Sequence, residues 1–235
     1  MKKGLCLLGA LILTVMGMAL ALRLFYYQST PVIRPVTMTG AQTLILDAGH
    51  GGEDGGALSV TGVAESGINL SIVRKMNDIL AFYGAAPTLL RTTDISLHSA
   101  GAETLREKKV SDLKNRTATV TGMEGATLIS IHQNTYPSQR YHGAQVFFSL
   151  TSGSQELAEH MQERIKSSLQ PENNRASKQI ADSIYLLNHI PNRAVLIECG
   201  FLSNPEEEAL LRDDAYQRKL AAVICQGWLT FVAGS

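Results

Sequence analysis

The sequence predicts an α/β fold: a single domain built on a twisted, mostly parallel sheet of about six strands flanked by helices. Short apolar runs of strand length alternate with longer segments whose apolar residues recur at helical spacing. Hydrophobic residues make up 45% of the 235 residues and charged residues 18%, which is typical of a globular domain with a sizeable core. No internal repeat and no second domain are visible in the sequence.

The amino-terminal segment predicts export. Met1-Lys2-Lys3 precedes an uncharged stretch, residues 4–22, whose length suits either a signal peptide or a spanning helix of about 20 residues. A buried core helix would carry a polar face, and this stretch has none. The lysines predict that the rest of the chain lies outside the cytoplasm. Ala19-Leu20-Ala21 fits a cleavage site, so residues 1–27 are interpreted as a signal peptide or a membrane anchor, and both alternatives stay open.

A linker and the domain follow. Residues 28–42 contain two prolines and few periodic apolar positions, which is typical of an extended linker, and the domain is expected over 43–235. The 21 basic and 21 acidic residues leave no net charge, which gives no support to a nucleic-acid partner. The three cysteines (Cys6, Cys199, Cys225) are too few for a disulfide framework or a cysteine-rich zinc module. Any metal would therefore be held by histidines and carboxylates.

The domain begins with a strand and a helix. The apolar run Leu44-Ile45-Leu46 leads through Asp47 into a glycine-rich loop, which predicts a core strand whose carboxyl end opens into a loop displaying His50. Apolar residues then recur at 68, 72, 76, 79 and 80, the spacing of a helix with one buried face, and Gly84 supplies its end. Ligands of open α/β sheets collect at the carboxyl ends of the strands, so this edge is the candidate site.

The middle of the domain repeats the alternation. Residues 88–90 form a second predicted strand, and residues 96–109 read as a polar loop without periodicity. Residues 110–123 predict a helix that begins near residue 111 or 112. Residues 126–132 form a third core strand that ends, like the first, in a histidine.

The carboxyl-terminal part supplies the remaining elements. Apolar residues at every fourth position over 157–169 predict another helix with one buried face. Asn204-Pro205 followed by three glutamates is typical of a helix start: a capping residue, a proline at the first helical position and acids near the positive end of the dipole. The other predicted elements are strands at 144–149, 184–187 and 194–199 and a last helix at 215–232.

Three residues suggest a zinc site. His50 and His132 follow two strands that should end at the same edge, and Glu65 begins the helix after the first strand. A catalytic zinc is typically held by three nitrogen and oxygen ligands, with a fourth position for water. Each residue alone is a weak signal. A lone histidine is more often hydrogen-bonded than bound to a metal, and Glu65 alone would be explained by its favourable interaction with the positive end of the helix dipole. The combination favours Zn²⁺ held by all three.

Glu198 is the candidate catalytic carboxylate. It follows the apolar run 194–197, and a carboxylate in a buried strand costs several kcal/mol unless it is paired or lies near a cation. Because neighbouring strand residues point to opposite faces, Cys199 should face away from the site and act as a small buried hydrophobe.

The other polar candidates are weaker. The remaining histidines, His98, His142, His160 and His189, are expected at the surface, with His142 and His189 as weak candidates for lining a cleft. Arg91 and Arg116 could bind a substrate carboxylate, but a structural ion pair is the preferred interpretation of both. Asp47 fits either a hydrogen bond to a ligand histidine or a structural loop contact.

These segments together resemble one known family. The motifs are Asp47-Ala48-Gly49-His50-Gly51-Gly52 with Asp54, Gly56-Ala57 and Glu65, then Ser130-Ile131-His132-Gln133-Asn134, and finally residues 195–204. In this order and spacing they closely resemble the zinc-dependent N-acetylmuramoyl-L-alanine amidases of the type-3 family, over the domain from about Thr43. The resemblance implies zinc ligands at His50, Glu65 and His132, a catalytic carboxylate at Glu198 and a mostly parallel sheet. One departure is Ser66-Gly67, where members often carry Lys-Asp after the zinc glutamate.

The resemblance also implies a substrate. The family cleaves the amide between the lactyl group of N-acetylmuramic acid and the L-alanine of the stem peptide, in peptidoglycan glycan strands. The short chain, the single apolar leader and the lack of a wall-binding module resemble the spore-cortex, germination-specific members, which make muramic-δ-lactam together with a deacetylase. This implies that the protein acts in the forespore intermembrane space. Whether it needs an activating partner protein stays open. The alternatives are a catalytically silent peptidoglycan-binding or regulatory domain and a zinc peptidase that acts on stem peptides.

Overall fold

The computed structural model describes residues 16–18 and 43–234. Residues 16–18 are helical, and the rest of the predicted leader and linker lies outside the described residues. Within the described ranges, no helix has the length and apolar character needed to cross a membrane. The folded domain is treated below by itself.

A six-stranded sheet forms the centre of the domain, in the order β2-β1-β3-β6-β4-β5. Strands β2, β1, β3 and β6 are parallel, β4 pairs antiparallel with β6, and β5 is parallel to β4. The predicted α/β fold with a mostly parallel sheet is confirmed. The strands are β1 (Leu44–Ala48), β2 (Thr88–Leu89), β3 (Thr127–Asn134), β4 (Gln145–Phe148), β5 (Lys178–Gln179) and β6 (Arg193–Phe201).

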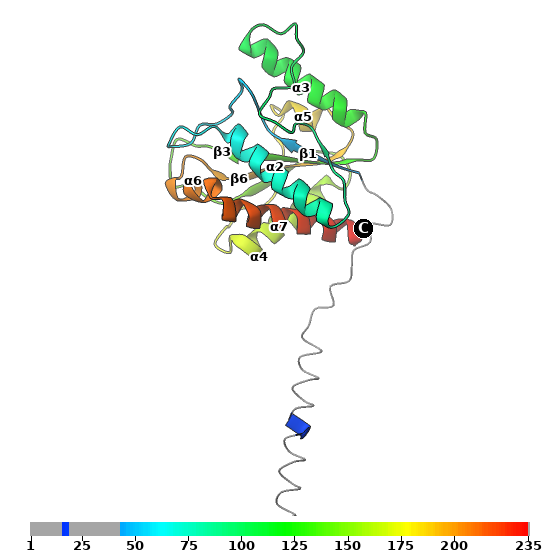
Figure 1. Ribbon diagram of the computed structural model, residues 1–235, viewed down its shortest axis with the longest axis vertical. Helices are drawn as coiled ribbons and strands as arrows, with labels where there is room; N and C mark the ends of the chain where they lie inside the picture. Colours follow the sequence, from blue (N-terminus) through cyan, green and yellow to red (C-terminus); the bar gives the residue numbers. More distant parts are fainter. Residues whose placement is uncertain (1–15, 19–42, 235) are drawn as a thin grey trace, which may run out of the picture. The chain divides into compact units, whose positions relative to one another are not determined.

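Helices cover the two faces of the sheet unequally. Helices α2 (Glu65–Phe82), α4 (Ser154–Leu169) and α7 (Asp214–Ala233) pack on one face, and the opposite face carries α3 (Leu105–Thr121) and the single turn of α5 (Tyr185–Asn188) (Figure 1). The remaining helix is α6 (Pro205–Arg212). The helix start predicted at Asn204 is confirmed, since its side chain accepts hydrogen bonds from the backbone of Glu206 and Glu207.

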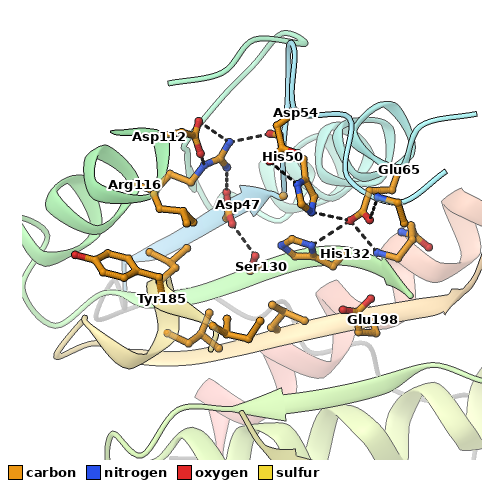
Figure 2. A pocket seen from close by; sticks show the side chains of 18 of the residues that line it. Asp47, His50, Asp54, Glu65, Asp112, Arg116, Ser130, His132, Tyr185 and Glu198 are labelled. Carbon is orange, nitrogen blue, oxygen red and sulfur yellow. Dashed lines mark hydrogen bonds and ion pairs between the residues drawn. The ribbon is translucent and has the colours of Figure 1, made fainter. Parts of the chain in front are cut away.

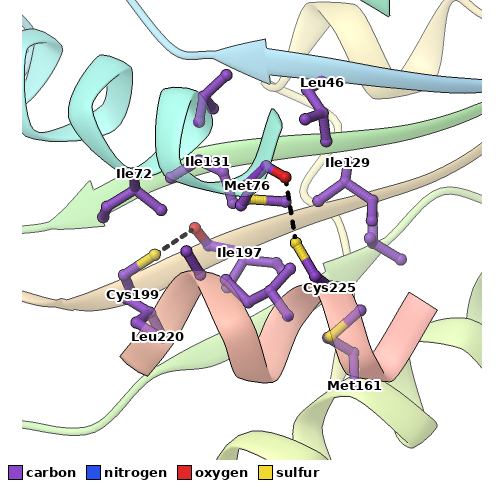
Figure 3. Close-up of a cluster of buried hydrophobic side chains, with 14 of the residues drawn as sticks. Leu46, Ile72, Met76, Ile129, Ile131, Met161, Ile197, Cys199, Leu220 and Cys225 are labelled. Atoms are coloured by element: carbon purple, nitrogen blue, oxygen red, sulfur yellow. Dashed lines mark hydrogen bonds between the residues drawn. The ribbon is translucent and has the colours of Figure 1, made fainter. Parts of the chain in front are cut away.

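The main core lies between the sheet and helices α2, α4 and α7 (Figure 3). Alternate residues of the central strands, such as Ile129 and Ile131 on β3, meet Met76 of α2 there, and all three are fully buried. Burying one such side chain contributes about 1.5–3 kcal/mol, so this layer supplies most of the stability. Helices α4 and α7 approach closely at Gly227, where a Cβ would lie 2.7 Å from the sulfur of Met161.

The opposite face of the sheet changes character along the strands. Near their amino ends, apolar residues such as Leu128 and Ala194 form a second, smaller core. Toward their carboxyl ends the same face carries polar residues. His132 of β3 stands beside Glu198 of β6, and Glu198 stands beside Gln145 of β4. The pairing therefore aligns these three residues in one row at the carboxyl end of the sheet.

Two predicted elements are wrong. The apolar run 184–187 is not a strand: residues 185–188 form α5, because both edges of β6 are already paired, with β3 and β4, and the run instead packs Leu186 and Leu187 onto the sheet. The loop expected over 96–109 ends earlier, since α3 begins at Leu105.

Candidate metal centre

Three segments bring the predicted metal ligands together. His50 lies just beyond β1 with a φ of 62°, Glu65 is the first residue of α2, and His132 lies within β3. The space between them depends on glycine. At Gly56, whose φ is 71°, a Cβ would lie 2.5 Å from Cγ of Glu65, and at Gly49 it would lie 2.2 Å from the ring of His132. The loop sequence thus allows three ligand side chains to converge.

The convergence is tight (Figure 2). Oε1 of Glu65 lies 3.1 Å from Nδ1 of His132 and 3.3 Å from Nε2 of His50. One ligand atom from each residue can be chosen so that all lie within 4.8 Å of one another. Asp54 lies 2.9 Å from Nδ1 of His50, an arrangement that orients the ring and leaves Nε2 for a metal. Two imidazoles and one carboxylate are a donor set that zinc prefers.

Glu65 is held in its ionised form. Burial alone would raise its pKa, but the hydrogen bond and charge of His132, helped by His50, hold the pKa of this carboxyl below its usual value. Its Oε2 accepts a hydrogen bond from the backbone N–H of Ala57 at 2.7 Å, and its Oε1 accepts one from Nδ2 of Asn69 at 3.1 Å. The side chain is therefore fixed in position from two sides.

Glu198 stands next to His132 in the sheet and faces the same side. Its Oε2 is buried and has no hydrogen-bond partner. Burial raises the pKa of Glu198 to about 7; the carboxylate of Glu65 adds to this rise and His132 opposes it. A carboxyl group with a pKa near neutrality can both take and return a proton. The neighbouring Cys199 is buried in the main core on the other face, as predicted, where burial raises the pKa of its thiol.

A buried charge cluster supports the His50 loop. Arg116 of α3 pairs with Asp47 and with Asp112, and it donates hydrogen bonds to the carbonyl oxygens of Ala48 (3.0 Å) and His50 (2.8 Å). Although burial opposes it, the Arg116 charge and a hydrogen bond from Ser130 hold the pKa of Asp47 below its usual value. Asp47 thus pairs with Arg116 and supports the loop. This is the structural role, one of the two that were predicted for it.

Arg91 is also structural. Its guanidinium donates to the carbonyl oxygens of Ala48, Gly49 and Ser66, at 2.8, 3.1 and 2.8 Å. The structural role preferred for both arginines is therefore confirmed. Arg116 forms the expected ion pairs, whereas Arg91 binds mainly backbone carbonyl groups. Sequence reasoning missed Asp54 and Asn69 as partners of the ligands. The spacing Glu65-x-x-x-Asn69, one helical turn, was the available signal for the second.

A pocket of about 370 Å³ opens over the metal ligands and Glu198 (Figure 2). One wall, between α3 and α5, combines apolar residues such as Leu113, Ile184 and Tyr185 with the charged side chains of Asp112 and Arg116. Neither His142 nor His189 lines it, so these two weak candidates are excluded from the cleft. The pocket places the three candidate metal ligands, a carboxyl group with a pKa near neutrality and several apolar side chains around one space, an arrangement suited to hydrolysis of a bulky substrate.

Comparison with known proteins gives the same picture. Residues 44–229 match the model of the N-acetylmuramoyl-L-alanine amidase family. The chain is 33% identical over 221 residues to the germination-specific N-acetylmuramoyl-L-alanine amidase of Bacillus subtilis (strain 168), covering 92% of each protein.

Solved structures agree with this match. The CwlD amidase of Clostridioides difficile, solved in complex with the GerS lipoprotein, is 38% identical, with a TM-score of 0.79, 83% of this chain and 100% of that chain covered. An N-acetylmuramoyl-L-alanine amidase of Clostridium difficile 630 is 29% identical, with a TM-score of 0.72 and 83% and 98% covered. The chain therefore belongs to the N-acetylmuramoyl-L-alanine amidase family and is an enzyme of that activity, acting on peptidoglycan.

Proposed function

We propose that His50, Glu65 and His132 hold a zinc ion and that Glu198 is the catalytic acid and base. The support is the geometry: three ligand atoms within 4.8 Å of one another, with the buried, unpartnered Oε2 of Glu198 on the same face of the sheet. When bound, zinc supplies a Lewis acid for the amide carbonyl and lowers the pKa of a water molecule.

The chain's own residues then carry the proton. Glu198 accepts a proton from the attacking water and later donates it to the nitrogen of L-alanine, which leaves with the stem peptide. Asp54 keeps the His50 ring in one orientation, and Ala57 and Asn69 do the same for Glu65.

The proposed setting is the spore cortex. The support is the similarity, over nearly the full length of both proteins, to the germination-specific amidase of Bacillus subtilis. Removal of the stem from muramic acid frees the lactyl carboxyl, which a muramic-acid deacetylase acting downstream would allow to close into a δ-lactam. We propose accordingly that the enzyme acts outside the cytoplasm, in the forespore intermembrane space, with residues 1–27 as signal peptide or anchor, 28–42 as linker and 43–235 as the catalytic domain.

A protein partner is also proposed. The similar Clostridioides difficile amidase was solved in complex with a lipoprotein, so we propose that this chain is activated by an exported protein. The experiment for the function is digestion of purified cortex and vegetative peptidoglycan with the zinc-loaded enzyme, with and without the partner candidate, followed by mass spectrometry. Free lactyl carboxyl groups on muramic acid are expected, more from cortex. Shortened stems would identify a peptidase, and unchanged material would identify a silent domain.

A further inference from the structure

The metal pocket continues along the chain into a surface of aromatic rings and arginines. Asn134 and Thr135 line the pocket and lead directly into the segment 136–143. The guanidinium carbon of Arg140 lies 5.3 Å from the ring centre of Tyr141, and that of Arg175 lies 4.5 Å from the ring centre of Phe201. The rings of Tyr136, Tyr141 and Phe201 contact one another in sequence, at 4.6 and 6.2 Å. These five residues, Tyr136, Arg140, Tyr141, Arg175 and Phe201, are called the arginine surface.

The arginine surface lies on the Glu198 side of the site. Gln145 of β4 stands beside Glu198 in the sheet, and its Oε1 accepts a hydrogen bond from Nη1 of Arg175 at 2.9 Å. Neighbouring strands are about 4.8 Å apart, so Arg175 is separated from Glu198 by little more than one strand and one side chain. An extended peptide covers about 3.3–3.6 Å per residue, and two or three residues span that separation.

The segment that carries Arg140 is firmly attached. The backbone N–H of Tyr136 donates to Oγ of Ser203 at 3.0 Å, and Nδ2 of Asn204 donates to the carbonyl oxygen of Gln139 at 2.9 Å. The N–H of Gly143 donates to Oε1 of Glu207 at 2.9 Å. Binding there would therefore require little ordering of the backbone, which favours affinity.

The charge on this surface is not neutralised by ion pairs. Within residues 43–234, Arg140 and Arg175 contact aromatic rings and polar groups but form no ion pair with a carboxylate. On the opposite rim, Lys108 and Lys109 pair with Glu53 and Asp54.

Nearby acids reduce this positive charge only in part. Both arginines line a hollow of about 290 Å³ together with the exposed Glu172. Glu207 accepts hydrogen bonds from the backbone N–H groups of Gly143 and Phe201, and its carboxyl group also interacts electrostatically with Arg175. Arg175 already donates from Nε to the carbonyl oxygen of His142 and from Nη1 to Gln145, which leaves its Nη2 for a carboxylate, while the guanidinium of the exposed Arg140 can bind one with both of its ends.

We propose that the arginine surface binds carboxylates of the stem peptide and so fixes which way the substrate lies. This rests on the proposed function, in which Glu198 donates a proton to the leaving nitrogen and the peptide therefore departs on the Glu198 side. Stem peptides carry acidic residues within the first three positions, inside the reach given above. The sugar half of the substrate then lies toward the opposite wall of the pocket, between α3 and α5.

The test uses the full-length enzyme and two soluble muropeptides, one with free stem carboxylates and one with the same carboxylates converted to carboxamides. The wild type is expected to show a KM about tenfold lower for the acidic stem, with similar kcat. Arg140 is exposed and donates no hydrogen bond within residues 43–234 that a substitution would break. Arg140→Gln should therefore reduce this preference about threefold. Arg140→Gln/Arg175→Gln should lose all of it, whereas Arg175→Lys keeps most. The wild-type preference should also shrink as salt is raised.

Arg106→Gln is the matched control, because this exposed arginine lies on α3, on the other side of the pocket. It should keep the wild-type preference. The proposal is overturned if Arg140→Gln and the double variant keep the preference for acidic stems, or if Arg106→Gln removes it. Failure of the proposed function looks different, since neither muropeptide would then release its stem at muramic acid.

Discussion

At the scale of single residues, Glu198 and Cys199 form a natural comparison, because they are adjacent on β6 and face opposite sides of the sheet. Glu198→Gln should keep the metal, since Glu198 is not among the three converging ligands, and should lower kcat about 10²–10⁴-fold. Cys199→Ala should leave kcat close to wild type and cost about 1 kcal/mol of stability. Metal analysis, steady-state kinetics and urea unfolding measure these effects.

The pH profile gives a second measure of the same assignment. A general base must be ionised, so wild-type kcat/KM should rise as the pH passes the pKa of Glu198, about 7 without a bound cation and lower beside one. This rise should be missing from the residual activity of Glu198→Gln. Normal turnover by Glu198→Gln, or an unchanged acidic limb, would remove Glu198 from its proposed role.

The charged and ligating residues of the candidate metal site could be predicted only where they lie beside a strand or helix that the sequence itself reveals. His50, His132 and Glu198 each interrupt or follow an apolar run, and Glu65 opens a periodic helix, so local patterns pointed to them. Arg116 reaches the His50 loop from a helix 66 residues away, and nothing local in the sequence marks that contact. Contacts that form only through tertiary packing cannot be predicted from a local sequence pattern.

At the scale of elements, α3 and α5 show where periodicity fails. The buried residues of α3 are Asp112, Arg116 and Val120, all beyond its first two turns, so those turns carry no apolar periodicity and read as a loop. The available signal was the capping box: Thr104 accepts from the N–H of Glu107, and Glu107 accepts from the N–H of Thr104. In α5, four apolar residues are too few to separate a strand from a helical turn without knowing which strand edges are free.

The exposed start of α3 should depend on that box. Thr104→Ala removes one of its two hydrogen bonds and should weaken the first turns by about 1 kcal/mol, speeding amide hydrogen exchange at residues 105–111 about fivefold. Thr121→Ala, at the other end of the helix, is the control and should leave amide exchange at residues 105–111 unchanged. Equal exchange in Thr104→Ala and wild type would show that contacts with the rest of the domain, and not the cap, hold this segment.

At the scale of the whole molecule, the sheet separates stability from chemistry. The main core under α2, α4 and α7 contains none of His50, Glu65 or His132, while the other face holds the polar row and the pocket. Loss of a metal should therefore abolish activity without unfolding the domain. Because the three ligands come from a loop, a helix start and a strand, the ion would still stabilise the fold by linking them.

Chelation followed by re-addition of zinc measures both effects. At a free zinc concentration of about 100 times Kd, binding contributes about 2.7 kcal/mol, which corresponds to roughly 5–10 °C in Tm for a domain of this size. The chelated protein should keep its far-UV circular dichroism, melt at that lower temperature and release no stems until zinc is restored. His132→Ala should melt like the chelated wild type and gain nothing from zinc. Unfolding on chelation would mean that the core is not self-sufficient, and activity retained without metal would contradict the proposed zinc site.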